Sequence, residues 1–134
     1  MNSRRIQIFI AMFFLMSVTL ACGFSVSTAN IKDAYMARDE AGTDRTTVFT
    51  SEDTFYCIVD LANAPDDTTV KAVWYAVDAQ DVDPNFKIDE YSLTSGDNVI
   101  PFSLSNDMLW PSGTYKVELY LNDELDRTLE FSVQ

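Results

Sequence analysis

The sequence has 134 residues, of which 47% are apolar, and its 9 Lys and Arg against 21 Asp and Glu give a net charge of −12. This length suits one domain with a core of its own. The chain has no histidine, which is the commonest general base and metal ligand, so we expect no catalytic site. The acidity argues against a nucleic-acid ligand, because phosphate binding needs clustered Lys and Arg. A non-catalytic module is the class of protein that remains.

The first segment is typical of a secretory signal. It begins with Arg4, Arg5 and no acid, and an apolar run follows over residues 6–21. That run is shorter than the roughly 18 or more apolar residues of a membrane-spanning helix. We therefore predict that residues 1–21 are a signal peptide. Since this segment holds two Arg and no acid, the rest of the chain carries a charge of −14.

Residues 18–22, Val-Thr-Leu-Ala-Cys, resemble the lipobox of bacterial lipoproteins, in which a small residue precedes an obligatory Cys. The sequence has Thr19 where the family usually has Leu. The resemblance implies that Cys22 becomes the lipid-modified first residue of the mature chain and that residues 22–30 form a short tether. The protein is then held outside the cytoplasm, through a lipid on Cys22, at the cell membrane or outer envelope of a bacterium. A plain secretory signal and an uncleaved anchor remain the alternatives.

The remainder of the chain predicts an all-β domain. Short segments with apolar residues at every second position recur between turn signals, without the spacing of an amphipathic helix. About seven strands in roughly 100 residues are typical of a Greek-key β-sandwich or barrel. The expected main strands cover 54–61, 70–77, 99–104, 115–121 and about 129–133, and weaker strands are expected at 31–37, 46–49 and 88–93.

Three residues carry a resemblance to the immunoglobulin pattern of Cys, core Trp and tyrosine corner: Cys57, Trp74 and Tyr115. In that family a second Cys follows the corner Tyr by two residues, and here that position is Val117. The resemblance implies an immunoglobulin-like β-sandwich of about seven strands over residues 31–134, without an inter-sheet disulfide. Cohesion must then come from apolar packing between the sheets, for which we expect Phe55, Trp74, Phe102, Leu119 and Phe131.

Cys57 alternates with Phe55 and Val59, which predicts that its side chain lies in the core. A Cys in apolar surroundings is inert. A reactive thiol and an intermolecular bridge are the alternatives. Cysteine catalysis is not expected, because no histidine is present to form the thiolate.

The acid-rich loop around Asp81, Asp83 and Asn85 is the best candidate for a metal site, since calcium prefers clustered oxygen ligands. The loop partly resembles the calcium loop of EF-hands, but Phe86 stands in place of the loop Gly and Ser92 in place of the closing Glu. An EF-hand is therefore rejected. A looser calcium site and a solvated acidic loop without metal both remain open, and no other cofactor is expected.

Trp110 lies in an apolar loop segment over residues 108–111. An exposed Trp is a frequent hot spot for partner binding. The alternative is that Leu109 and Trp110 close one end of the sandwich.

The immunoglobulin topology predicts which loops share an end of the sandwich. Loops at 62–69, 95–98 and 122–126 are expected beside the tether, and loops at 38–45, 78–85 and 105–113 at the opposite end. We predict that a partner contacts the opposite end, at Asp81, Asp83 and Trp110.

The sequence therefore predicts a lipid-anchored cell-surface protein that binds an extracytoplasmic protein or glycan, or serves as an accessory piece of an envelope complex. Two alternatives remain. One is a sandwich that inhibits a protease through an exposed loop, and the other is a calcium-dependent adhesion or structural module.

Overall fold

A computed structural model describes residues 28–134. The predicted signal peptide over 1–21, Cys22 and most of the predicted tether over 22–30 lie outside these residues. Every element from 28 to 134 is a β-strand, so the all-β prediction is confirmed for this part of the chain. No helix in the described part is long and apolar enough to cross a bilayer.

The described chain forms eight strands, so the count of about seven was low, although each strand overlaps one of the eight ranges expected from the sequence. The shortest is β2, which lies within the weak strand expected at 46–49 and pairs in parallel with the last residues of β8. The strands are β1 (Asn30–Ala37), β2 (Val48–Phe49), β3 (Phe55–Ala62), β4 (Thr68–Ala79), β5 (Phe86–Ser95), β6 (Asn98–Leu104), β7 (Gly113–Leu121) and β8 (Glu124–Val133).

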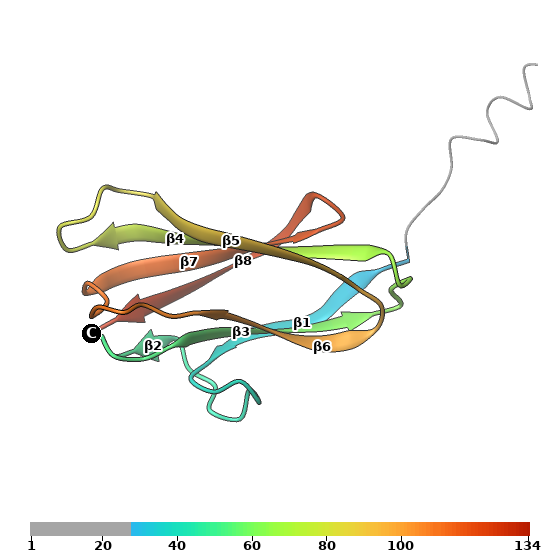
Figure 1. The fold of residues 1–134 in the computed structure, drawn as a ribbon, viewed down its shortest axis with the longest axis horizontal. Helices are drawn as coiled ribbons and strands as arrows, with labels where there is room; N and C mark the ends of the chain where they lie inside the picture. The colour runs from blue at the N-terminus through green and yellow to red at the C-terminus, as the bar shows by residue number, and fades with distance from the viewer. Residues whose placement is uncertain (1–27) are drawn as a thin grey trace, which may run out of the picture.

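Two sheets pack face to face, which confirms the predicted β-sandwich (Figure 1). One sheet has the order β1-β3-β6 and the other the order β2-β8-β7-β4-β5. Strands β5 and β6 are each at the edge of their sheet, and the two-residue turn 96–97 carries the chain from one sheet to the other between them. Pro101, which has no backbone donor, lies on the edge strand β6, where a missing donor is tolerated.

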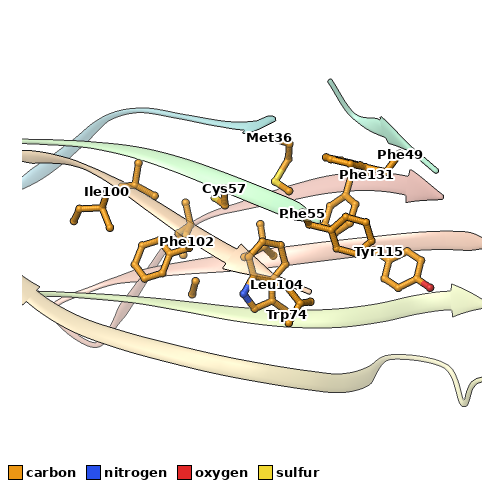
Figure 2. Packing of buried hydrophobic residues seen from close by; sticks show 14 of the residues in the cluster. Met36, Phe49, Phe55, Cys57, Trp74, Ile100, Phe102, Leu104, Tyr115 and Phe131 are labelled. Atoms are coloured by element: carbon orange, nitrogen blue, oxygen red, sulfur yellow. The ribbon is translucent and has the colours of Figure 1, made fainter. Parts of the chain in front are cut away.

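Side chains at every second position of the strands fill the space between the two sheets. On β4, Val70, Ala72, Trp74 and Ala76 are at most 2% exposed, because alternate residues of a strand face the same side. A cluster of aromatic rings extends the core toward one end of the sandwich (Figure 2). A fully buried side chain of this size stabilises the fold by about 1.5–3 kcal/mol. The five residues expected between the sheets are all buried there: Phe55, Trp74, Phe102, Leu119 and Phe131.

Three turns gather at the end of the sandwich where the described chain begins, here called the N-terminal end. The Thr28 hydroxyl donates to the Asn63 carbonyl at 2.9 Å. The Ala64 amide donates to Asp97 Oδ1 at 2.6 Å, which joins the β3–β4 and β5–β6 turns. The Thr69 amide donates to Oδ1 of Asn122, in the β7–β8 turn, at 3.0 Å. The predicted grouping of these loops beside the start of the domain is therefore confirmed.

The opposite end, here called the far end, holds the loops over 50–54, 80–85 and 105–112 together with the C-terminus (Figure 1). The Gln80 amide donates to the Ser112 carbonyl and the Trp110 amide to the Ser51 carbonyl, each at 2.9 Å, so these loops are packed against one another. The loop expected here at 38–45 instead folds back over the outer face of the β1-β3-β6 sheet, where the Tyr35 hydroxyl donates to the Gly42 carbonyl at 3.2 Å (Figure 1).

Candidate functional site

A tyrosine corner supports the far end from inside. The Tyr115 hydroxyl donates to the carbonyl of Pro111, four residues upstream, at 2.5 Å. Burial raises the pKa of the Tyr115 phenol, so the hydroxyl keeps its proton and acts as a donor. Val117 lies opposite Trp74 in the β4–β7 pairing, and both are buried. The structure thus places Trp74, Tyr115 and Val117 in the core between the sheets.

Cys57 is fully buried on β3 and forms no disulfide within residues 28–134. Burial raises the pKa of its thiol to about 12. The thiolate is the reactive form of cysteine, so a raised pKa suppresses nucleophilic chemistry.

We expect the Cys57 thiol of the native protein to resist a disulfide reagent at pH 8 and to react within minutes after urea unfolding, when its pKa falls to about 8.5. Because the folded pKa is the higher one, the thiol is protonated across the whole range from pH 5 to 9. Thiol titration of the Cys22→Ala variant with and without urea measures this directly. Rapid reaction of the folded protein contradicts the assignment.

The predicted calcium loop, which contains Asp81, Asp83 and Asn85, connects β4 to β5 at the far end. Asp81 and Asn85 have left-handed backbone conformations, with φ of 61° and 54°. The Asn85 amide donates to the Val77 carbonyl at 3.0 Å, which closes the loop. All three predicted ligands are exposed. From 28 to 134, no three Asp, Glu or Cys side chains are grouped closely enough to hold a metal ion, and calcium binding at this loop stays a prediction.

Trp110 was predicted as a partner contact on condition that it is exposed, and that condition is not met. Its side chain is 7% exposed and stacks on Phe55, with ring centroids 4.6 Å apart. The indole Nε1 donates to the Asp53 carbonyl at 2.9 Å. Trp110 therefore closes the far end of the sandwich, because both its apolar ring and its one donor find partners inside. Leu109, expected to help close this end, is instead 64% exposed.

Exposed apolar side chains surround the buried Trp110. Met108 is 78% exposed, Leu109 64% and Phe86 51%. Leu109 and Phe86 line two separate hollows, and Val82 and Trp110 line both of these hollows. We call Val82, Phe86, Met108 and Leu109 the far-end apolar surface. The sequence singled out the segment 108–111 but not Val82 or Phe86, which only the fold brings to the same end.

The charges at the far end leave the acidic side chains in excess. Arg38 is held between Asp44 at 3.5 Å and Asp53 at 3.4 Å, and also donates to the Val48 carbonyl. A hydrogen bond from the Thr50 backbone amide lowers the pKa of the Asp53 carboxyl, and a weaker contribution from Arg38 lowers it further. Partial burial of the carboxyl acts in the opposite direction. By contrast, within the described chain Asp81, Asp83 and Asp107 form no ion pair, so these three residues flank the far-end apolar surface with uncompensated negative charge.

No family model and no curated protein matches this sequence. Solved structures do match its fold. An immunoglobulin-like protein from Pseudomonas aeruginosa is 12% identical with a TM-score of 0.53, over 82% of this chain and all of that one. The C-terminal domain of wzt is 15% identical with a TM-score of 0.52, over 83% and 76%.

A third match is the Pseudomonas fluorescens alkylpurine DNA glycosylase AlkC bound to abasic DNA. It is 18% identical with a TM-score of 0.53, and it covers 81% of this chain but only 31% of the glycosylase. At these identities the likeness shows the fold alone. The chain from 28 to 134 therefore has an immunoglobulin-like β-sandwich fold.

Proposed function

We propose that this protein is an extracytoplasmic lipoprotein, anchored through Cys22, whose immunoglobulin-like domain is a non-catalytic binding or envelope-accessory module for a protein or a glycan. One observation carries the proposal. The exposed apolar side chains of Phe86, Met108 and Leu109 gather at the end of the sandwich opposite to its N-terminal entry. Exposed apolar surface with a polar border is characteristic of interaction sites.

The anchor and this surface are compatible in geometry. Residues 23–29 extend to at most roughly 25 Å, at about 3.3–3.6 Å per residue, so a lipid on Cys22 keeps the N-terminal end near the bilayer. The charge of −14 after residue 21 is repelled by anionic lipids, which lifts the domain and presents its far end. The absence of histidine from the whole sequence supports a non-catalytic role.

The test of the anchor is Cys22→Ala in the full-length chain, expressed in a bacterial host that is fed an alkyne-tagged fatty acid. We expect the wild-type protein to carry the tag and to sediment with membranes. The variant is expected to lose the tag completely, because a thioether-linked lipid and the N-terminal acyl group both depend on this Cys.

Cys57→Ala is the matched control, since it removes the other cysteine and should leave labelling unchanged. Equal labelling of wild type and Cys22→Ala, or an unlabelled wild-type protein that stays in the cytosol, contradicts the anchored role.

A further inference from the structure

Strands β5 and β6 form two free edges on the same side of the sandwich. Among the strands of the described chain, β5 pairs only with β4, and β6 pairs only with β3. The tight turn 96–97 joins the two strands, so their edges run along one side of the molecule (Figure 1). A free edge presents unpaired backbone amides and carbonyls, to which another extended chain can add.

Two hollows lie along this side, between β5 and β6. The apolar hollow, of about 390 Å³, is at the far end and is lined by Val82, Phe86, Ile88, Leu104 and Trp110 together with Asp89. The acidic hollow, of about 310 Å³, follows along the strands and is lined by Asp89, Glu90, Tyr91, Phe102 and Ser103. Asp89 borders both, so the two hollows are consecutive sections of one groove, here called the β5–β6 groove.

Asp89 has an unusual place for a carboxylate. It lies opposite Trp74 in the β4–β5 pairing, and Trp74 faces the core, so Asp89 is on the inner face of its strand. Two residues on, Tyr91 has the same orientation, and its ring lies 6.3 Å from that of Phe102 on β6. Within residues 28–134 Asp89 forms no ion pair, whereas its neighbour Glu90 is paired with Lys87 at 3.0 Å. The Asp89 carboxylate accepts a hydrogen bond from the Glu90 amide at 2.8 Å, and the charge of Lys87 acts on it from a distance. The groove therefore contains a carboxylate that is exposed to an occupant and is not in direct contact with a cation.

The spacing and charge of the groove select one kind of occupant. Alternate residues of an extended chain face the same side at about 6.6 Å intervals, which suits consecutive hollows. The apolar hollow accepts an aliphatic or aromatic side chain, and Asp89 favours a cation in the acidic hollow. A second copy of this chain is disfavoured, because each domain carries −14.

We propose that the β5–β6 groove binds an extended segment of a partner protein, which adds as a strand and has an apolar residue and a Lys or Arg two positions apart. This inference rests on the proposed binding role and assigns it a site and a ligand chemistry. The far-end apolar surface overlaps the groove at Val82 and Phe86, so a partner approaching the far end meets the groove directly.

The test measures binding of the fluorescently labelled peptide Thr-Val-Leu-Thr-Lys-Thr-Val to the full-length protein in detergent, by anisotropy. Replacing the peptide's lysine with glutamate is expected to weaken binding, and so is Asp89→Asn, each by about fivefold, the factor typical of a partly exposed ion pair. Ile88→Lys, which puts a charge into the apolar hollow, is expected to abolish binding. Raising the salt concentration weakens binding of the lysine peptide to the wild type.

Asp67→Asn is the matched control, since it removes an exposed carboxylate at the N-terminal end and should leave the affinity unchanged. A thermal melt of each variant verifies the fold. Equal affinity of the two peptides, or equal effects of Asp89→Asn and Asp67→Asn, overturns the proposal. The proposal is also overturned if the Asp89→Asn variant self-associates while its peptide binding is unchanged. In that case the role of Asp89 is only to protect a strand edge from pairing with another copy. Binding lost in Met108→Ser/Leu109→Ser but retained in Asp89→Asn overturns the groove while leaving the proposed binding role intact.

Discussion

Replacing Phe55 with alanine is expected to lower the free energy of unfolding by about 3–5 kcal/mol, the range for a large aromatic removed from a core. The Phe55 ring is fully buried, and its centroid lies 4.6 Å from that of Trp110, 4.8 Å from Phe131 and 5.0 Å from Phe49 (Figure 2). The substitution leaves a cavity in place of the ring that joins the aromatic side chains of β2, β8 and the 105–112 loop. Urea denaturation followed by tryptophan fluorescence measures the change.

Phe86→Ala is the control for Phe55→Ala, because it removes the same ring from a position that is 51% exposed. We expect it to change stability by no more than about 0.5–1 kcal/mol. Similar losses for the two variants are incompatible with a core centred on Phe55.

Gly113→Ala is the second substitution with a large expected effect, a loss of about 2–4 kcal/mol from backbone strain and overpacking together. Gly113 begins β7 with φ of 152°, a region that other residues rarely adopt. A Cβ at this position collides with the Asp78 carbonyl oxygen and lies 2.5 Å from Ala79 Cα. Both are backbone atoms of the neighbouring strand β4, so neither can move aside cheaply. Thermal unfolding of the purified variant measures the loss.

Gly96→Ala provides the comparison for Gly113→Ala. Its new Cβ meets the carboxylate of Asp66 at 2.5 Å, which is the end of a flexible side chain, and its backbone is not in the left-handed region. We expect a loss of less than about 1 kcal/mol. If Gly96→Ala loses as much stability as Gly113→Ala, or more, then the close contact with β4 does not constrain the residue at position 113.

Much of the sandwich is predictable from the sequence, because period-two alternation records which face of a strand is buried. The segment 70–77 alternates cleanly, and the structure extends it at both ends to β4 (Thr68–Ala79). Most loops were also grouped correctly at the two ends, with 38–45 as the exception. The weak strand expected at 46–49 forms only the two-residue β2, whose Phe49 packs against Phe55 and Phe131, contacts that local sequence does not encode.

The candidate site was harder to predict than the strands. The sequence identified the far end and the acidic loop, but it left open whether Trp110 is an exposed contact or closes the end of the sandwich. Whether a loop Trp faces inward depends on partners distant in sequence, here the Asp53 carbonyl, 57 residues away, and the Phe55 ring. Asp89 was not among the predicted site residues. Its inward orientation follows from its pairing with the core residue Trp74, and the bulge that follows lets both Ile88 and Asp89 border the groove.

By itself the sequence determined the composition that limits the chemistry, the strand pattern, the lipobox-like segment and the ends at which the loops gather. Each of these depends on local order along the chain. Only the tertiary structure decided that Trp110 is buried, that Met108 and Leu109 are exposed, and that β5 and β6 border a groove with Asp89 inside it. These features arise where segments from different sheets meet, and side-chain packing between such segments is not a periodic property of either one.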